Sequence, residues 1–172
     1  HAKTWGNLCR NARAQLDRIM EDSGFGNQVF SILATVPPQH MYGFESSVLV
    51  ALQGRQVFSA AHPFYPQDMC KELEYLPRPR VLVSTPFHLK KLMESGLALP
   101  PVDLVISATA PMNAQVATSI EEKFQTMLQE IYGCTETGQL ATRLPTTHSV
   151  WRTYGQVEIV QLTAGNDEEP NA

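Results

Sequence analysis

The sequence has few cysteines and no paired cysteine motif. Cys9, Cys70 and Cys134 are the three cysteines among 172 residues, and they lie far apart without Cys-x-x-Cys spacing. An odd number of widely spaced cysteines argues against a disulfide framework, so we expect reduced thiols. Cys134 has no basic residue close to it in sequence, which favours a small buried side chain over a nucleophile.

Long apolar runs and an excess of basic residues are also absent. No stretch approaches the roughly 20 apolar residues that span a bilayer, and residues 1–20 lack the apolar centre of a signal peptide. The formal net charge of −4 provides no basic field for nucleic acid or anionic lipid. We therefore expect a cytoplasmic protein with no membrane span and no nucleic-acid partner.

Several common motifs of hydrolases and nucleotide-binding proteins are missing as well. The chain contains no Gly-x-Ser-x-Gly elbow, no Gly-x-x-x-x-Gly-Lys-Ser/Thr phosphate loop and no Gly-x-Gly-x-x-Gly turn. The five histidines show no metal-ligand spacing with the cysteines, which argues against structural zinc.

What the sequence does contain is an alternation of short apolar runs with segments of helical periodicity. Strands are predicted over 28–36, 56–60, 81–84, 102–107 and 127–132, and helices over 7–22, 43–52, 66–76, 87–94 and 113–124. This order predicts an α/β fold with a mostly parallel sheet wound by helices through right-handed crossovers. After Gly138 the pattern decays, with an irregular sixth strand over 156–162 and a loop or frayed tail over 163–172.

Four chain segments are expected at the carboxyl edge of that sheet, where ligands bind in open α/β folds. They are residues 36–43, 84–87, 107–112 and 132–138. His40 in the first segment is placed to donate to a carboxylate or to gate a channel, but a lone histidine is more often a packed or solvated structural residue. The small residues after Ser107 would let a flat ring lie on the backbone, and they fit a tight strand-to-helix turn equally well.

The last of these segments carries the most distinctive chemistry. Tyr132 offers a flat face, Thr135 a hydroxyl and Glu136 a carboxylate, and these groups suit a base, a phosphate and a divalent cation. Gly133 and Gly138 allow close backbone approach or a positive φ. Taken alone, the segment is also consistent with a polar turn after a buried strand.

Together, the segments resemble consecutive motifs of the adenylate-forming superfamily, which includes acyl-CoA synthetases, aryl-CoA ligases, luciferases and peptide-synthetase adenylation domains. The matching segments are 35–43 (TVPPQHMYG), 83–92 (VSTPFHLKKL), 107–112 (SATAPM) and 130–138 (EIYGCTETG). The resemblance implies a Rossmann- or flavodoxin-like subdomain over residues 1–143. Residues 144–172 would begin a following β-rich segment and a flexible tail.

The resemblance also implies a reaction. A carboxylic acid is activated with ATP and Mg²⁺ to an acyl-adenylate, and the acyl group then passes to a thiol of coenzyme A or an acyl carrier protein. Thr135 would meet the α-phosphate, Glu136 would hold Mg²⁺ and His40 would lie at the acyl-carboxylate and thiol side. The adenine or AMP site would comprise Tyr132, Gly133, Thr109, Ala110 and Pro111. The acyl pocket would comprise Tyr42, Gly43, Phe44, Phe87, Ser107 and Gly138.

The sequence also departs from the family pattern. Ala108 and Thr109 stand where the family usually has two glycines. The glycine- and serine-rich phosphate loop, the ribose-binding aspartate and the lysine of the C-terminal lid have no counterpart. We therefore expect a central fragment of a longer acyl- or aryl-acid ligase that is inactive by itself. The alternative is a non-catalytic nucleotide-binding or interaction domain that retains the fold.

Overall fold

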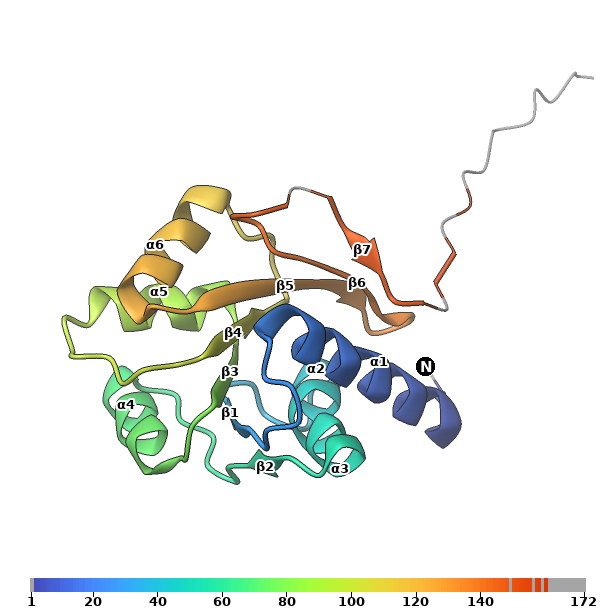
Figure 1. Ribbon diagram of the computed structural model, residues 1–172, viewed down its shortest axis with the longest axis horizontal. Helices are drawn as coiled ribbons and strands as arrows, with labels where there is room; N and C mark the ends of the chain where they lie inside the picture. The colour runs from blue at the N-terminus through green and yellow to red at the C-terminus, as the bar shows by residue number, and fades with distance from the viewer. Residues whose placement is uncertain (1, 149, 156, 159, 161–172) are drawn as a thin grey trace, which may run out of the picture.

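The structure is a computed structural model that describes residues 2–148, 150–155, 157, 158 and 160. Its strands form one seven-stranded sheet with the order β2-β1-β3-β4-β5-β6-β7 (Figure 1). The first five strands along the chain pair in parallel. They are β1 (Ser31–Ala34), β2 (Val57–Phe58), β3 (Arg80–Ser84), β4 (Leu104–Ser107) and β5 (Met127–Cys134). The predicted α/β class with a mostly parallel sheet is confirmed.

Helices cover both faces of the sheet (Figure 1). One face packs against α1 (Trp5–Ser23), the π-helical η1 (Phe44–Leu49) and α3 (Val50–Gly54), which follow the short α2 (Met41–Gly43). The other face packs against α4 (Pro66–Tyr75), α5 (Pro86–Glu94) and α6 (Ala114–Phe124). Successive strand residues point to opposite faces, so Ile32 and Ala34 join the first core cluster while Leu33 joins the second.

The helix ends follow from local sequence chemistry. The Thr4 hydroxyl accepts a hydrogen bond from the backbone N–H of Asn7 and begins α1, and Gly24 ends it with a φ of 67°. Thr85 caps α5 in the same way. The single helix predicted over 43–52 is instead three consecutive pieces, because a π-helical stretch replaces regular turns over 44–49. No helix in the described part of the chain is long and apolar enough to cross a bilayer.

The largest difference from the predicted strands lies at the end of β5. This strand continues to Cys134 and turns directly into β6 (Gly138–Arg143), which pairs with it antiparallel. The prediction that the strand ends at Tyr132 is therefore wrong. A Cβ at Gly133 would lie 2.2 Å from the carbonyl oxygen of Gly138, so this close strand pairing requires glycine. Backbone pairing extends the strand here, and an apolar pattern does not reveal it.

The sheet also gains an edge strand that was not predicted, β7 (Arg152–Thr153), which pairs antiparallel with β6. Most of the strand predicted over 156–162, and the whole tail over 163–172, lie outside the described residues. Val157, Glu158 and Val160 are described and are in no strand. The division of the chain at residue 143 stays a prediction, although β6 ends there.

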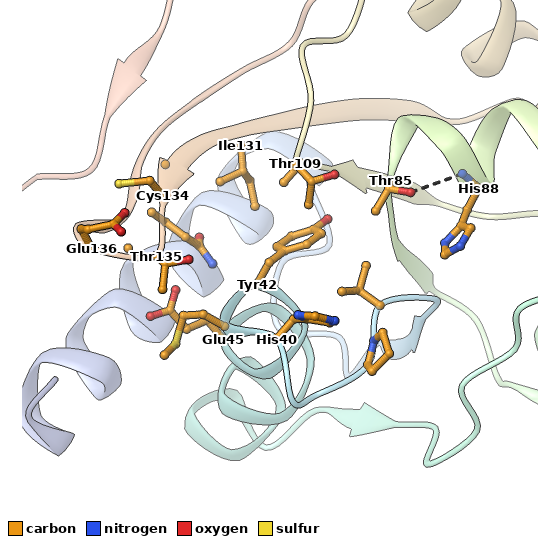
Figure 2. Close-up of a pocket in the computed structure, with 17 residues that line it drawn as sticks. His40, Tyr42, Glu45, Thr85, His88, Thr109, Ile131, Cys134, Thr135 and Glu136 are labelled. Atoms are coloured by element: carbon orange, nitrogen blue, oxygen red, sulfur yellow. Dashed lines mark hydrogen bonds between the residues drawn. The ribbon is translucent and has the colours of Figure 1, made fainter. Parts of the chain in front are cut away.

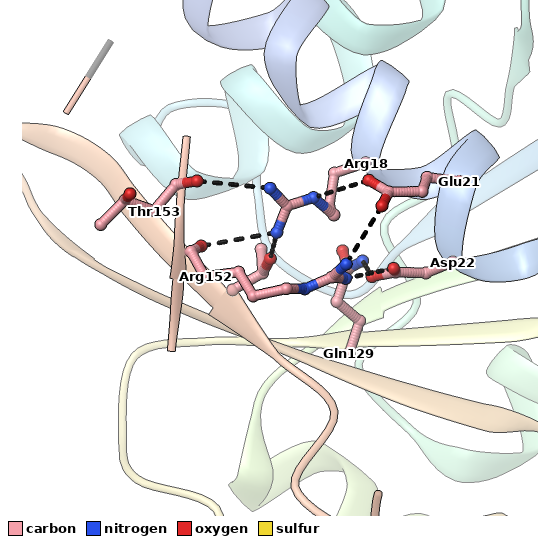
Figure 3. A network of polar contacts seen from close by, with 7 residues as sticks. Arg18, Glu21, Asp22, Gln129, Arg152 and Thr153 are labelled. Atoms are coloured by element: carbon pink, nitrogen blue, oxygen red, sulfur yellow. Dashed lines mark hydrogen bonds and ion pairs between the residues drawn. The ribbon is translucent and has the colours of Figure 1, made fainter. Parts of the chain in front are cut away.

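A network of charged side chains holds β7 against α1 (Figure 3). Arg18 donates hydrogen bonds to the Thr142 hydroxyl at 2.8 Å and to the Thr153 carbonyl at 3.3 Å. Arg152 pairs with Asp22, which also accepts a hydrogen bond of 2.7 Å from Gln129 Nε2. Because the Asp22 side chain is 4% exposed, these bonds fix the antiparallel edge of the sheet relative to α1.

Candidate active site

A cavity of about 600 Å³ lies at the carboxyl ends of β1, β3, β4 and β5 (Figure 2). Parallel strands bring their following loops to this edge, as the sequence predicts. The predicted site residues that line the cavity are His40, Tyr42, Thr109, Gly133, Thr135, Glu136 and Gly138. Segments that are nearly 100 residues apart in sequence thus share one cavity.

The turn between β5 and β6 forms one wall of the cavity. Thr135 and Glu136 both line it, and Figure 2 shows their side chains beside Cys134. A hydrogen bond from the Cys134 side chain lowers the pKa of the Glu136 carboxyl, and the backbone N–H of Glu136 acts in the same direction. Glu136 is therefore an ionised carboxylate at neutral pH.

Cys134 itself corrects a prediction. All three thiols are free, as expected, but Cys134 is exposed and not a buried spacer. Its Sγ lies 3.1 Å from the hydroxyl of Thr137. The physical reason is that β5 runs past the edge of the core at this point, so its last residues sit in a solvent-facing hairpin.

The carboxylate of Glu136 fits one mode of Mg²⁺ binding. Within the described residues, no group of three or more histidine, cysteine, aspartate or glutamate side chains could hold a metal ion. Mg²⁺ is commonly bound by one or two carboxylates together with substrate phosphates and water. Glu136 therefore suits a cation shared with a nucleotide, and the described residues offer no protein-only metal cage.

Tyr42 lines the cavity between the ends of β3 and β4. Its hydroxyl lies 2.9 Å from the Ser84 carbonyl oxygen and 3.0 Å from the Ile106 carbonyl oxygen, so its proton is donated to the ends of β3 and β4. Burial raises the pKa of the Tyr42 phenol. Tyr42 is therefore a neutral side chain that fixes α2, to which it belongs, against the ends of β3 and β4.

A hydroxyl–imidazole chain that was not predicted reaches the cavity from the opposite side. His88 lines the cavity, and its Nδ1 lies 2.8 Å from the Thr35 hydroxyl, which is 2.9 Å from the Ser84 hydroxyl. Burial lowers the pKa of His88, which favours the neutral imidazole. Sequence analysis missed this chain because Thr35 and His88 meet only through the pairing of β1 with β3.

Some predicted site residues do not line this cavity. Tyr132 is 58% exposed, and its ring lies 5.5 Å from that of Trp151. Phe87 is exposed, whereas Phe44 packs against the core. The others outside the lining are Ala110 and Pro111, which are exposed, and Gly43 and Ser107, which are buried. The roles expected of all these residues stay predictions.

The segment expected along the adenine is held in place by a buried ion pair. Glu130 accepts hydrogen bonds from the Met112 backbone N–H at 2.8 Å and from Arg143 Nε at 2.7 Å. Arg143 also donates to the Met112 carbonyl oxygen at 3.3 Å. The two side chains thus fix Met112, and with it the preceding residues 109–111. Sequence analysis gave neither Glu130 nor Arg143 a role.

Thr109 keeps a glycine-like backbone in spite of its side chain. Its φ is 81°, in the left-handed region that costs non-glycine residues roughly 1–2 kcal/mol. Although Ala108 and Thr109 replace the usual glycines, Thr109 still adopts the positive φ that a glycine would favour.

We expect Thr109→Gly to raise the free energy of unfolding by about 0.5–1 kcal/mol, because relief of strain exceeds the added entropy of the unfolded chain. Urea unfolding measures this change. Thr146→Gly, at an exposed turn position without a positive φ, is the matched control and should destabilise by about 0.4–1 kcal/mol. Equal destabilisation by both substitutions would contradict strain at Thr109.

Comparison with known proteins identifies the family. A sequence profile of the family described as AMP-binding enzyme matches residues 3–163. The chain belongs to the AMP-binding enzyme family. No curated protein matches the chain. The adenylate-forming family expected from the four motifs is thus confirmed.

Several solved structures share the fold. Apo MatB from Rhodopseudomonas palustris aligns with a TM-score of 0.64 and 22% identity over 82% of this chain and 28% of MatB. O-succinylbenzoate coenzyme A synthetase (MenE) from Bacillus subtilis, in complex with AMP, aligns with a TM-score of 0.63 and 18% identity over 79% of this chain and 28% of MenE. A malonyl-CoA ligase with methylmalonyl-CoA and AMP bound aligns with a TM-score of 0.62 and 18% identity, over 81% of this chain and 31% of the ligase. The chain spans less than a third of each of these proteins.

Proposed function

We propose that this chain is the central nucleotide- and acid-binding part of an AMP-forming acid–thiol ligase. The observation that carries the proposal is the single cavity onto which Thr135, Glu136, His40 and Thr109 all open, in a chain of the AMP-binding enzyme family. Related folds have been solved with AMP and with an acyl-coenzyme A product bound, which supports the same ligand classes here.

In this proposal the nucleotide lies across the carboxyl edge of β4 and β5. Tyr132, Gly133 and residues 109–111 contact the adenine, and the Thr135 hydroxyl donates to an α-phosphate oxygen. Glu136 holds Mg²⁺, which would neutralise charge on the phosphate oxygens. The exposed faces of Tyr132 and of residues 109–111 leave them accessible to a planar ring.

The acid lies deeper in the cavity. Its carboxylate oxygen attacks the α-phosphorus while the bond from that phosphorus to the bridging oxygen of pyrophosphate breaks. The residues contribute by positioning the two reactants. His40 and Tyr42 hold the acid side of the cavity, and a thiol of coenzyme A or a carrier protein later displaces AMP from the acyl group.

The experiment that tests this proposal is ATP–pyrophosphate exchange by the full-length protein with a panel of aliphatic and aromatic acids. We expect acid-dependent incorporation of labelled pyrophosphate into ATP. Absence of exchange with every acid would contradict the ligase function.

We expect the isolated 172-residue chain to show no acid-dependent AMP release. The physical reason is that it spans less than a third of related ligases, and its cavity lining contains no lysine or arginine among the described residues to neutralise phosphate charge. AMP release followed by chromatography, with the full-length protein as positive control, measures this. Turnover by the chain alone would contradict the expectation.

The same lack of a described cationic side chain in the lining favours one second candidate, a nucleotide-binding domain without catalysis. Two measurements distinguish the two functions: AMP binding by calorimetry and acid-dependent ATP–pyrophosphate exchange. Binding of AMP by the full-length protein without exchange for any acid would favour the second candidate.

A further inference from the structure

One side of the cavity carries a histidine that the proposed reaction does not use. His88 lines the cavity and is half-buried. Its imidazole is held by the Thr35 hydroxyl, 2.8 Å from Nδ1, and by the edge-on ring of Phe64, whose centroid is 5.4 Å away. In Figure 2, His88 lies on the side of the cavity opposite Glu136, with Tyr42 between them. The imidazole is therefore fixed on the acid side, away from the proposed phosphate site.

The hydroxyl groups behind His88 determine which ring nitrogen carries the proton. The Thr35 hydroxyl lies 2.8 Å from His88 Nδ1 and 2.9 Å from the Ser84 hydroxyl, and it has one proton to donate. Among the described residues, the Ser84 hydroxyl has no other hydrogen-bond partner, and Ser84 is 1% exposed. A buried hydroxyl proton without an acceptor is costly, so Ser84 donates to Thr35 and Thr35 donates to Nδ1. The neutral imidazole therefore carries its proton on Nε2.

The Nε2–H group of His88 is available to a ligand. Nε2 makes no hydrogen bond to any residue that the structure describes, and it is not one of the fully buried polar atoms that lack a partner. It is therefore an accessible donor on a ring that lines the cavity. Burial lowers the pKa of His88, which keeps the ring neutral. A ligand with an acceptor oxygen can replace the water that this donor would otherwise bind.

The rest of the lining selects among acceptor groups. Its acidic residues are Glu45 and Glu136, and its described part contains no lysine or arginine. A second carboxylate on the substrate would meet two glutamates and no permanent cation, so it is disfavoured. An uncharged carbonyl oxygen accepts from Nε2–H without that cost. The apolar residues of the lining suit a hydrocarbon body between the two ends of the acid; they are Val36, Pro37, Met41, Ala108 and Ile131.

We propose that His88 determines substrate specificity by donating a hydrogen bond from Nε2 to a carbonyl oxygen of the acid substrate, at the end away from the reacting carboxylate. The inference rests on the proposed ligase function and adds a substrate class to it, oxo acids with an apolar body. His88 disfavours an acid with a hydrocarbon group in place of the carbonyl, because Nε2–H then loses its water without gaining a partner.

The test compares pairs of acids that differ at one carbonyl in ATP–pyrophosphate exchange by the full-length protein. Suitable pairs are 4-acetylbenzoate with 4-isopropylbenzoate, 5-oxohexanoate with hexanoate, and 7-oxooctanoate with octanoate, which place the carbonyl at different distances from the reacting carboxylate. We expect kcat/KM for at least one oxo acid to exceed that of its partner by about fivefold or more, the effect of one uncharged hydrogen bond. Terephthalate, which has a carboxylate in place of the ketone, should be a poorer substrate than 4-acetylbenzoate.

Substitutions of His88 assign the preference to the imidazole. His88→Leu removes the donor and should reduce the ratio of the two kcat/KM values to about one or below, mainly by slowing the oxo acid. His88→Gln keeps an N–H donor on a side chain of similar reach and should retain part of the preference. His148→Leu, at an exposed position outside the cavity lining, is the matched control and should leave the ratio unchanged. A loss of folding lowers both acids together, so the ratio separates specificity from stability.

The outcomes distinguish this inference from the proposed function. Exchange with several acids but no preference for the oxo member of any pair would overturn the inference, while the ligase function stands. A preference that survives His88→Leu, equal ratios for His88→Leu and His88→Gln, or faster exchange with terephthalate than with 4-acetylbenzoate would also overturn it. Exchange with no acid at all would overturn the ligase function and this inference with it.

Discussion

Replacing Glu136 with glutamine is expected to slow ATP–pyrophosphate exchange by the full-length protein about 10²–10³-fold, the usual cost of removing one group that stabilises charge in a transition state. The carboxylate lines the cavity, and its lowered pKa keeps it ionised. The amide has nearly the same shape but no charge, so it is a weaker ligand for Mg²⁺. Exchange measured over a range of Mg²⁺ concentrations should show a higher Mg²⁺ requirement for the variant.

The control for this substitution is Glu122→Gln, at an exposed position of α6 outside the cavity lining. It makes the same chemical change and should leave exchange within twofold or so of the unchanged protein, as surface substitutions generally have small effects. Equal exchange by Glu136→Gln and the unchanged protein at all Mg²⁺ concentrations would remove Glu136 from the proposed metal site.

Replacing Arg143 with methionine is expected to lower the free energy of unfolding by about 3–5 kcal/mol, because it leaves a buried carboxylate without its cation. The Glu130 side chain is 3% exposed and bonds Arg143 Nε at 2.7 Å. The guanidinium also stacks on the Trp151 ring at 4.6 Å from its centroid. Urea unfolding followed by circular dichroism measures the loss.

A double substitution tests the origin of that loss. Glu130→Gln combined with Arg143→Met should be more stable than Arg143→Met alone, because the unpaired charge is gone. Arg13→Met, an exposed arginine on α1, is the control and should change stability by no more than about 0.5 kcal/mol. If Arg143→Met and Arg13→Met destabilise equally, the pair does not hold residues 109–112 in place.

Much of the fold could be predicted from local patterns in the chain. Apolar runs of strand length placed β1, β3 and β4, and proline and glycine residues placed the ends of most helices. The antiparallel strands β6 and β7 escaped prediction because their residues are small or polar, as in GQLATR. The strand character of β6 arises from its hairpin pairing with β5, and that of β7 from its pairing with β6. The Arg18 and Arg152 network, which joins residues more than 100 positions apart in sequence, then holds this edge against α1.

The residues of the candidate site also fall into those that the sequence identifies and those that only the packing reveals. The motif residues His40, Thr109, Thr135 and Glu136 were identifiable in the sequence because their chemistry is confined to short segments at strand ends. Glu45 was visible only as an acidic residue near a helix start. Its burial beside Gly138 and Lys3 depends on how α1 packs against η1 and β6.

The sequence by itself determined the α/β class, the order of its parallel strands along the chain, and the set of segments at their carboxyl ends, because hydrophobic periodicity and strand-end chemistry are local properties. The tertiary structure alone decided which side chains meet. It joined Thr35 to His88, Glu130 to Arg143, and Lys3 to Glu45. The members of each pair lie on different elements of the fold, and their meeting depends on sheet pairing and helix packing that no single segment encodes.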